Sequence, residues 1–405
     1  MSYTGIDDAN ADLDTQCSPP YAPKNAAYKT HARHRRLGYL IRVLRNRPAG
    51  VRPAPVLATF PGRDADARPP VRIFIGTESG QAEAERVLVW SILKHRDPDR
   101  SYEIHLMKRI AGFERRLWKT GFTNYRYAIP HFAGAAGRAI YNDVDQIYLA
   151  DPAELVDLPL EGAGACSVDG RDTSVMLLDC ARMALVWPLA RARASKAGHP
   201  DYRALRDAHD LWGPLAPEWN ARDGAYRAGA TKLAHFTTLH TQPWRPFPEE
   251  LRYEPHPDAD AWLALQREAD RAGFTVFTAE RPSLEFTACA EAAATAPPQP
   301  AARAKSCDLK RLARLLGAGA DPGAPSLLVL EFGRRLEGLE TTGAAVEPHD
   351  PLTAEATPAP RAFDVATAPE TLHLAPEDDA PWLLDLLFRS ARRHVYVSVA
   401  PANRL

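Results

Sequence analysis

The feature that most constrains the fold of this chain is an apolar strand that ends in two aspartates. Residues 139–141 (Ala-Ile-Tyr) indicate the end of a buried strand, and Asp143-Val144-Asp145 follows it. Because side chains alternate along an extended backbone, the two carboxylates point the same way while Val144 faces the core. The next residues predict a helix with Asp151 as its N-cap and a proline in its first turn. A strand-to-helix junction of this kind indicates an α/β protein with its chemistry at the strand end.

The spacing of the two carboxylates suits a divalent cation. Asp143 and Asp145 offer hard oxygen ligands on one side of the strand end. Mg²⁺ and Mn²⁺ prefer carboxylate ligands and fill the rest of their shell with water and phosphate oxygens. Solvated loop carboxylates are the competing interpretation of the same pair.

Composition limits the classes of protein that this chain can be. Its 405 residues suffice for two or three domains, and the 45% hydrophobic and 25% charged fractions are those of a globular protein. A net charge of −1 excludes a polyanion-binding surface over the whole chain. The five cysteines are odd in number and scattered, which favours neither a disulfide framework nor a zinc knuckle. The polar first residues and the lack of a long apolar run predict a cytoplasmic protein.

The first 69 residues are expected to form a polar tail, a basic helix and a proline-rich linker. Residues 28–45 have apolar side chains at helical spacing, and residues 24–47 carry eight Lys or Arg and no acid. Two interpretations of this helix stay open. It lies peripherally on an anionic membrane, or it docks on the next domain. Prolines from residue 48 to residue 70 predict the linker.

A folded unit is predicted to begin at Val71. Residues 71–76 form a strand that ends in glycine, residues 77–81 a loop, residues 82–94 a helix and residues 102–107 a second strand. This order predicts a mostly parallel sheet, with the 76–81 loop near the two aspartates. Further along, we expect a strand through residues 175–178, a helix over residues 181–196, and a short strand that ends at His235.

Five motifs in this order resemble one known family. They are the strand-Gly near residue 76, Tyr141-Asn-Asp-Val-Asp145, Thr173-Ser-Val-Met-Leu-Leu-Asp179, Trp219-Asn220, and His235-Phe-Thr followed by Pro243-Trp244. Together they resemble the retaining glycosyltransferases of family 8, which include glycogenin and bacterial galactosyltransferases, over about residues 70–250. The resemblance implies the GT-A fold (a single nucleotide-sugar-binding α/β domain). It also implies a hexosyltransferase with a nucleotide-diphospho-sugar donor, usually UDP-linked, and bound Mn²⁺ or Mg²⁺.

The resemblance also implies roles for particular residues. The expected metal ligands are Asp143, Asp145 and His235, with His240 as a spare candidate. The expected catalytic residues are Asp143, Asp145 and Gln242. The donor is expected to bind at Gly76, Thr77, Glu78, Asn142, Val144, Thr173, Ser174 and Thr238.

Two residues depart from the family pattern His-x-x-Gly-x-x-Lys-Pro-Trp. Thr238 replaces the glycine, and Gln242 stands where the lysine is expected, in a turn that is one residue longer. Loss of that lysine removes a cation from the leaving diphosphate, which is worth about tenfold or more in rate. The candidates to supply a cation instead are Lys232, Arg86, Arg138 and Arg245.

The C-terminal part is expected to be a second, smaller Rossmann-like α/β domain, residues 309–405, after a linker over residues 281–308. Its phrases Phe363-Asp-Val and Leu372-His-Leu are similar to those of class I S-adenosylmethionine methyltransferases. However, the cofactor turn reads Gly333-Arg-Arg335, and about ten residues separate it from residue 347, too few for the usual helix and second strand. We expect a degenerate domain without bound S-adenosylmethionine that serves packing or a homodimer.

Two alternatives to a glycosyltransferase remain. A haloacid-dehalogenase-like phosphatase also has an Asp-x-Asp after an apolar strand, but it would leave the His235 and Trp244 motif unexplained. A catalytically silent protein that binds a nucleotide sugar or a partner would explain the missing lysine. The acceptor has no signature in the sequence, and a glycan or glycolipid is the expectation.

Overall fold

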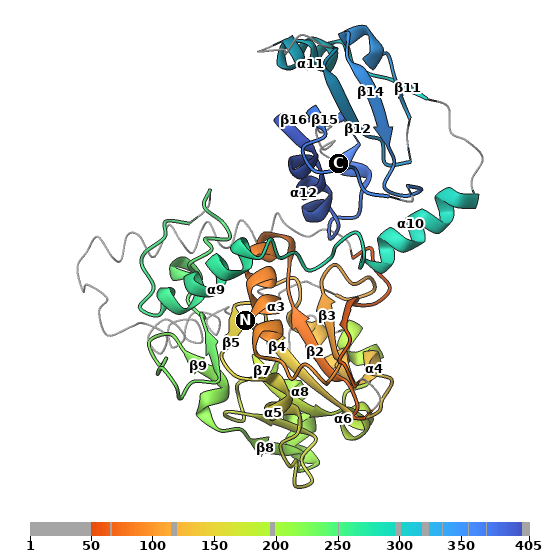
Figure 1. The fold of residues 1–405 in the computed structure, drawn as a ribbon. Coiled ribbons are helices and arrows are strands. Elements are labelled where there is room, and N and C mark those ends of the chain that lie inside the picture. The colour runs from red at the N-terminus through yellow and green to blue at the C-terminus, as the bar shows by residue number, and fades with distance from the viewer. Residues whose placement is uncertain are drawn as a thin grey trace, which may run out of the picture. The chain divides into compact units, whose positions relative to one another are not determined.

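The structure is a computed structural model, and most of the chain from residue 50 onward can be described. The described residues are 50–64, 67–114, 120–194, 199–249, 251–295, 301–317, 324–333, 335–354, 356–369 and 371–398. The predicted basic helix lies outside them. The chain divides into two compact units, Met1–Phe274 and Thr275–Leu405, and each is described by itself (Figure 1).

A seven-stranded sheet forms the centre of the first unit. Its strands, in spatial order, are β1 (Val56–Phe60), β3 (Tyr102–Met107), β2 (Val71–Gly76), β4 (Arg138–Asp143), β7 (Val175–Asp179), β6 (Ala165–Ser167) and β8 (Trp212–Pro214). The pairs β3–β2, β2–β4 and β6–β8 are parallel, whereas β1–β3, β4–β7 and β6–β7 are antiparallel. The predicted α/β class is confirmed, and the sheet is mixed rather than mostly parallel because β7 runs against β4.

A three-stranded sheet lies next to the end of β4. It contains β5 (Gln146–Tyr148), β10 (Leu233–His235) and β9 (Ala221–Arg222), in the order β5-β10-β9. The first unit also contains α3 (Ala82–His95), α4 (Ile129–Phe132), α5 (Pro152–Val156), α6 (Cys180–Val186), α7 (Leu189–Ala194), α8 (His199–Ala208) and α9 (Ala259–Arg271). Its short 3₁₀ helices are η1 (Ser79–Gln81), η2 (Thr123–Ala128), η3 (Pro217–Asn220) and η4 (Leu239–Thr241).

Two apolar clusters hold these layers together. One packs α3, the small sheet and α9 through Val87, Ile147, Phe236, Trp262 and Leu265, and α9 lies beside α3 in Figure 1. The other includes residues of β2, β4, β7, η2, α4, α6 and α8. The second cluster holds Tyr141 before the two aspartates and the first holds Ile147 after them, which gives the aspartates a rigid support.

Two local predictions for this unit are wrong. Strand β1 lies within the segment predicted as a linker. It pairs with β3 at the edge of the sheet. Pro55 and Pro61 flank the strand and lie outside it, so they remove no hydrogen bond between the two strands. The single helix predicted over residues 181–196 is interrupted between α6 and α7 at Trp187-Pro188. Proline has no N–H to donate and clashes with the preceding turn, which explains the break.

The capped helix after the aspartates is confirmed. Asp151 precedes α5, and its side chain accepts a hydrogen bond from the Ala153 backbone N–H. Asp151 also accepts from the Tyr102 hydroxyl at 2.6 Å and from the Asp97 backbone N–H at 2.9 Å. This carboxylate therefore ties α5 to the start of β3 and the turn before it.

The second unit contains a four-stranded parallel sheet in the order β14-β12-β15-β16. The strands are β12 (Ser326–Leu330), β14 (Ala345–His349), β15 (Phe363–Pro369) and β16 (Ala391–Ser398). Its helices are α10 (Leu284–Thr295), α11 (Ser306–Gly317) and α12 (Ala380–Ser390), with the 3₁₀ helices η5 (Leu339–Thr342) and η6 (Leu372–Leu374). Two short strands, β11 (Ala302–Arg303) and β13 (Leu336–Glu337), pair separately.

Two expectations for this unit need correction. The short spacing after residue 335 predicted no room for a helix and a second strand, but strand β14 is present and pairs with β12 in parallel. The connection between β12 and β14 contains only the short 3₁₀ helix η5 in place of a longer α-helix. The predicted linker over residues 281–308 contains the helix α10, whose run of alanines favours helix. The small Rossmann-like sheet is present, and the methyltransferase likeness stays a prediction.

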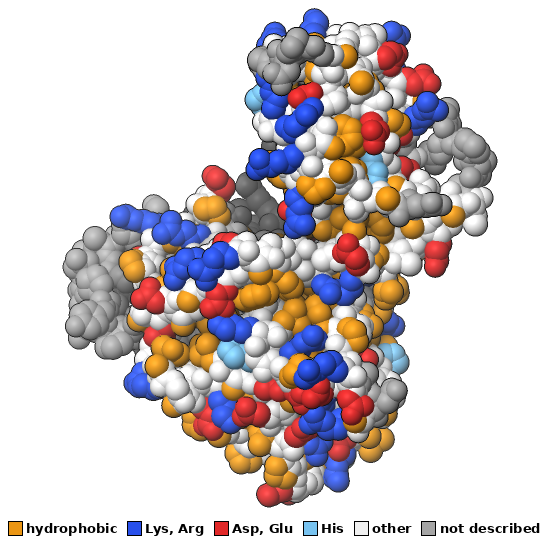
Figure 2. All heavy atoms as spheres, in the orientation of Figure 1, with side chains coloured by type: hydrophobic (Ala, Val, Ile, Leu, Met, Phe, Trp, Pro, Cys, Tyr) orange, Lys and Arg blue, Asp and Glu red, His pale blue; other side chains and the backbone are white. Residues whose placement is uncertain are grey.

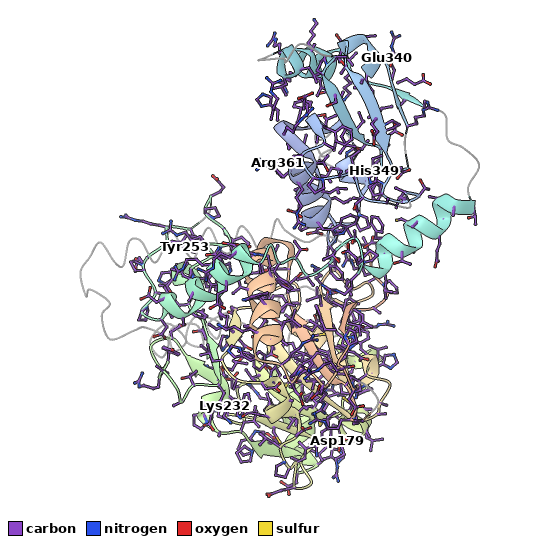
Figure 3. All side chains as sticks on the ribbon, viewed as in Figure 1. Asp179, Lys232, Tyr253, Glu340, His349 and Arg361 are labelled. Carbon is purple, nitrogen blue, oxygen red and sulfur yellow. The ribbon has the colours of Figure 1, made fainter. Side chains whose placement is uncertain are left out.

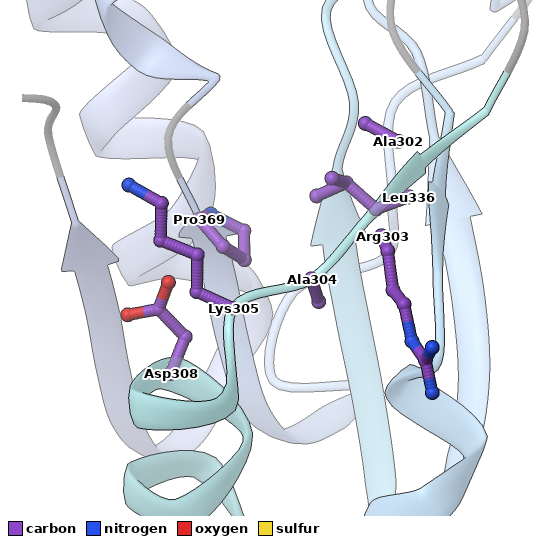
Figure 4. A pocket seen from close by; sticks show the side chains of 7 residues that line it. All are labelled: Ala302, Arg303, Ala304, Lys305, Asp308, Leu336 and Pro369. Carbon is purple, nitrogen blue, oxygen red and sulfur yellow. The ribbon is translucent and has the colours of Figure 1, made fainter.

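A small pocket opens at the carboxyl end of β15 in this unit (Figure 4). Its lining comes from β11, the start of α11, β13 and Pro369. In Figure 4 the segment 302–305 crosses this edge of the sheet. Ligands of open α/β sheets usually bind outside the carboxyl ends of the strands, and here the chain itself occupies part of that edge.

The described surface matches the balanced composition. On the face of the first unit seen in Figure 2, acidic and basic side chains are interspersed. Among the described residues, no helix combines the length and the apolar character that a membrane crossing requires. The described cysteines, Cys166, Cys180, Cys289 and Cys307, are all free thiols.

Candidate metal centre

Strand pairing brings His235 to the two aspartates. Asp143 is the last residue of β4, and β5 begins at Gln146. Strand β10 pairs with β5 in antiparallel register, with His235 opposite Gln146. The Phe236 backbone N–H then donates to the Asp145 carbonyl at 2.9 Å. The small sheet therefore places the end of β10 directly beside the acidic pair.

The three side chains form one group that could hold an ion. Asp143, Asp145 and His235 each offer one ligand atom within 4.8 Å of the others. The His235 Nε2 atom lies 3.2 Å from Asp145 Oδ1. Asp145 Oδ1 is buried and has no hydrogen-bond partner in the described part of the chain. His240 does not belong to this group.

Two side chains to which the sequence analysis assigned no role hold Asp143. The Arg126 guanidinium donates to Asp143 Oδ1 at 2.8 Å, and the Tyr141 hydroxyl donates to the same oxygen. Arg126 also lies over the Tyr141 ring, 4.5 Å from its centroid. Burial raises the pKa of Asp143, Arg126 opposes this, and the nearby Asp145 adds to it. Arg126 therefore reduces the cost of keeping two carboxylates together.

A second hydrogen-bond network holds the other side of the His235 ring. Its Nδ1 atom lies 2.8 Å from Asn220 Oδ1. The Asn220 amide nitrogen donates to Asp172 Oδ2, and at 3.2 Å to the Ser174 hydroxyl. Arg222 donates to the same Asp172 oxygen at 2.7 Å. Asn220 and Arg222 end the neighbouring elements η3 and β9, whereas Asp172 and Ser174 precede β7, so this network joins two segments that are distant in the sequence.

The residues present fit a divalent cation. Asn220 presents a carbonyl oxygen to His235, so Nδ1 carries a hydrogen, and in the neutral ring the lone pair of Nε2 faces Asp145 Oδ1. Either a proton on Nε2 or a bound cation would bridge His235 Nε2 and Asp145 Oδ1, which lie 3.2 Å apart. Burial lowers the pKa of His235, but Asp145, Asp143 and Asp172 outweigh it and raise the pKa. Two carboxylates and an imidazole whose other nitrogen is hydrogen-bonded are a typical donor set for Mn²⁺.

The residues predicted to bind the donor near β2 lie next to this centre. Gly76 pairs with Asp143 across β2 and β4, and its carbonyl accepts from the Val144 N–H at 3.1 Å. A Cβ at Gly76 would lie 2.5 Å from the Tyr141 hydroxyl oxygen, so a side chain has no room. Thr77 is buried, and its hydroxyl has no hydrogen-bond partner in the described part of the chain. Glu78 precedes η1.

The other predicted donor residues fall into two groups. Thr173 and Ser174 lie beside the centre, since Thr173 accepts from Arg126 through its carbonyl and its hydroxyl, and Ser174 O accepts from the Asp143 N–H at 3.0 Å. The Asn142 side chain does not reach the three-residue group. It is buried between Gln146, to which it donates, and the Tyr148 hydroxyl, from which it accepts. Val144 is buried, as the alternation predicts.

Gln242 contacts the centre, although it replaces a cation. Its amide nitrogen donates to Asp145 Oδ2 at 3.2 Å and to the Phe236 carbonyl at 2.9 Å. Thr238, two residues after Phe236, donates its hydroxyl to Asp223. The turn that follows His235 is therefore bound both to Asp145 and to Asp223.

Three of the four cations suggested as substitutes have partners elsewhere. Lys232, labelled in Figure 3, pairs with Glu154 at 2.8 Å. Arg138 donates to the carbonyls of Val156 and Leu158, both at 2.8 Å. Arg86 pairs with two acidic side chains, Glu83 and Asp270. For the fourth, Arg245, the backbone N–H donates to the Gln242 carbonyl.

Comparison with known proteins gives structural neighbours and no sequence family. No family model and no curated protein sequence match the chain. WbbM, described as a bifunctional glycosyltransferase, is 14% identical with a TM-score of 0.36, over 50% of this chain and 54% of WbbM. The galactosyltransferase LgtC is 10% identical with a TM-score of 0.36, over 49% of this chain and 96% of LgtC. The glycosyltransferase GlyE of Streptococcus pneumoniae TIGR4 is 12% identical with a TM-score of 0.37, over 84% of this chain and 94% of GlyE. Similarity at this level does not establish an activity, so the function has to follow from the chemistry of the site.

Proposed function

We propose that the first unit is a metal-dependent glycosyltransferase of the GT-A type that takes a sugar from a nucleotide-diphospho-sugar. The observation that carries this proposal is the group of Asp143, Asp145 and His235 beside the end of β4, whose ligand atoms all lie within 4.8 Å of one another. The site lies where the strand ends of an α/β sheet usually bind nucleotides.

Divalent ion chemistry explains why such a site suits this reaction. When bound, Mn²⁺ or Mg²⁺ neutralises the negative charge that develops on a departing diphosphate. Asp143, Asp145 and His235 would hold the ion. Arg126 and Tyr141 keep Asp143 in place through their hydrogen bonds to its Oδ1 atom. The site needs no strong base if the leaving diphosphate accepts the acceptor's proton, a route compatible with retention at the anomeric carbon.

Finer features of the proposal follow from the resemblance alone. We take UDP as the expected nucleotide, a hexose as the transferred sugar, and a glycan or glycolipid as the acceptor. A cytoplasmic location, contact of the basic helix with an anionic membrane and a homodimer stay predictions. The proposed domains are a GT-A-like unit after the first 69 residues and a small C-terminal unit without bound S-adenosylmethionine.

A silent nucleotide-sugar-binding protein is the second candidate, and one observation favours it. Gln242, which stands where the family has a lysine, donates its amide to Asp145 Oδ2. A neutral amide stabilises a leaving diphosphate less than an ammonium group does. A site of this kind can bind a donor and fail to release its diphosphate. A phosphatase is not favoured, because that class leaves the position of His235 beside the two aspartates unexplained.

One experiment separates these candidates. The full chain is incubated with Mn²⁺ and a panel of UDP- and GDP-sugars, and release of nucleoside diphosphate and binding of the donor are both measured. We expect turnover or donor hydrolysis that EDTA and Asp145→Asn abolish. Asp157→Asn, an exposed carboxylate paired with Arg100, is the control and keeps the activity. Metal-dependent binding without turnover favours the silent protein, and no binding of any donor refutes both.

A further inference from the structure

Asp172 lies behind the metal centre as a buried carboxylate with four hydrogen-bond donors. Its side chain is 6% exposed. Oδ1 accepts from the Ser174 backbone N–H at 2.9 Å and from the Ser174 hydroxyl at 2.6 Å. Oδ2 accepts from the Asn220 amide and from Arg222. A buried carboxylate with this many donors stays ionised, and the proposed function does not yet use it.

This carboxylate determines which way the Asn220 amide faces. An ionised carboxylate only accepts hydrogen bonds, so the NH₂ group of Asn220 must point toward Asp172. The Ser174 hydroxyl, 3.2 Å from the same nitrogen, is consistent with this orientation. The carbonyl of Asn220 is then left for His235, 2.8 Å from its Nδ1. Turning the amide over would place its oxygen against the carboxylate and its NH₂ against the ring N–H.

The orientation of the amide in turn fixes the histidine. A carbonyl accepts a hydrogen bond from Nδ1, so Nδ1 carries the hydrogen, and the neutral ring keeps its lone pair on Nε2. Nε2 is the atom that lies 3.2 Å from Asp145 Oδ1. Ligating histidines are usually held by such a bond on their other nitrogen, and losing it typically costs 10- to 100-fold in metal affinity.

We propose that Asp172 is a positioning residue that, through Asn220, holds His235 in the tautomer and orientation needed to bind a divalent cation. This inference rests on the proposed metal site and extends it to residues that would not touch the ion. Arg222 supports the arrangement: burial raises the pKa of Asp172, but Arg222 and the Ser174 hydrogen bonds outweigh it and lower the pKa.

Affinity for Mn²⁺ alone tests this inference without an activity assay. The dissociation constant is measured on the full chain by the electron paramagnetic resonance signal of free Mn²⁺, and the melting temperature without metal is measured beside it. We expect Asn220→Ala and Asp172→Ala each to raise the dissociation constant about 10- to 100-fold. Asp172→Ala is the informative variant, because it leaves Asn220 and all three ligands in place.

Asp151→Ala is the matched control. Asp151 also accepts three hydrogen bonds, from Ala153, Tyr102 and Asp97, but none of its partners is a proposed ligand. We expect this variant to lower the melting temperature and to leave the Mn²⁺ dissociation constant unchanged. A general loss of rigidity would instead affect both variants in the same way.

Exchange of the two polar groups provides the rescue. In the double variant Asp172→Asn with Asn220→Asp, the carboxylate at position 220 still accepts from His235, and the amide at position 172 donates to it. We expect most of the affinity to return. The exchange also decides the question if Asp172→Ala does not fold, because it keeps both positions polar and of equal size.

The outcomes distinguish this inference from the proposed function. If the unaltered chain binds no Mn²⁺, the metal site and the positioning role are both overturned. If it binds Mn²⁺ and the dissociation constant is the same in Asp172→Ala and in the exchange as in the unaltered chain, only the positioning role is overturned. Asp172 would then stabilise the loop before β7 and nothing more.

Discussion

Asp223 fastens the turn that follows His235, and its removal should destabilise the first unit in a pH-dependent way. Oδ1 of Asp223 accepts from the Thr237 backbone N–H at 2.8 Å and from His256 Nε2 at 2.9 Å. Oδ2 accepts from the hydroxyls of Thr237 and Thr238, both at 2.6 Å. The His256 ring accepts from the Asp258 N–H on its other nitrogen, so Nε2 carries the donated hydrogen.

The structure gives the size and the sign of this effect. Burial raises the pKa of Asp223, but the hydrogen bonds from His256, Thr237 and Thr238 outweigh it and lower the pKa from 3.8 to about 2. The side chain is only 12% exposed, so solvent screens these contacts little. A decrease of this size corresponds to about 2 kcal/mol of folding free energy. Because the pKa is lower in the folded chain, this stability is present above pH 3.8 and is lost as the pH falls through about 2.

Urea denaturation of the unaltered chain and of Asp223→Asn, followed by tryptophan fluorescence at several pH values, measures the effect. We expect the free energy of unfolding of Asp223→Asn to be lower than that of the unaltered chain by about 2 kcal/mol at pH 7 and at pH 5. At pH 3 this difference in unfolding free energy should be smaller by about 1 kcal/mol. Asp99→Asn, which removes an exposed ion pair with Arg63, should cost less than about 1 kcal/mol. Equal stabilities at pH 7, or a gap that stays constant down to pH 3, would refute the reasoning.

Four further predictions concern the metal centre. Gly76→Ala should lower stability by about 1–3 kcal/mol, measured by thermal unfolding, since the added methyl group would lie 2.5 Å from Tyr141 and 2.6 Å from Phe122; an unchanged melting temperature contradicts this close packing. Mn²⁺ at about 100 times its dissociation constant should raise the free energy of unfolding of the unaltered chain by about 2.7 kcal/mol, measured by calorimetry. The same Mn²⁺ concentration should leave the free energy of unfolding of His235→Ala unchanged. Because the pKa of His235 is raised, protons compete with the ion and the affinity should fall from pH 8 to pH 6 in titration calorimetry; a pH-independent affinity argues against His235 as a ligand. Gln242→Lys should tighten binding of nucleoside diphosphate more than of nucleoside monophosphate, and equal effects on both would show that position 242 does not contact the diphosphate.

Local sequence patterns sufficed where one segment determines its own structure. The strand over residues 102–107 was predicted with its observed bounds, because apolar residues alternate there and polar ones limit it. The helix α5 was predicted from Asp151 and the proline after it, which are signals within four residues. Strand β1 was missed because the surrounding prolines suggested a linker, although none lies inside the strand.

Contacts between segments that are distant in the sequence could not be predicted from local sequence patterns. Arg126 lies in η2 and Asp172 in the loop before β7, and neither has a neighbour pattern that indicates a role. Their importance appears only when β4, β7 and η3 are packed together. A signal for Asn220 was present, since it belongs to one of the family motifs, but the motif alone does not reveal that its carbonyl faces His235. The break between α6 and α7 could have been predicted from Pro188.

The metal centre illustrates how much depends on register. His235 reaches the aspartates only because β10 pairs with β5 so that His235 lies opposite Gln146. A shift of one residue would turn its ring to the other face and bring Ala234 or Phe236 to the site. The buried cluster of Ile147, Phe236 and Trp262 opposes that shift, since it would expose their apolar faces. The same packing that stabilises the small sheet therefore sets the distance between imidazole and carboxylate, and stability and metal affinity should change together when this cluster is altered.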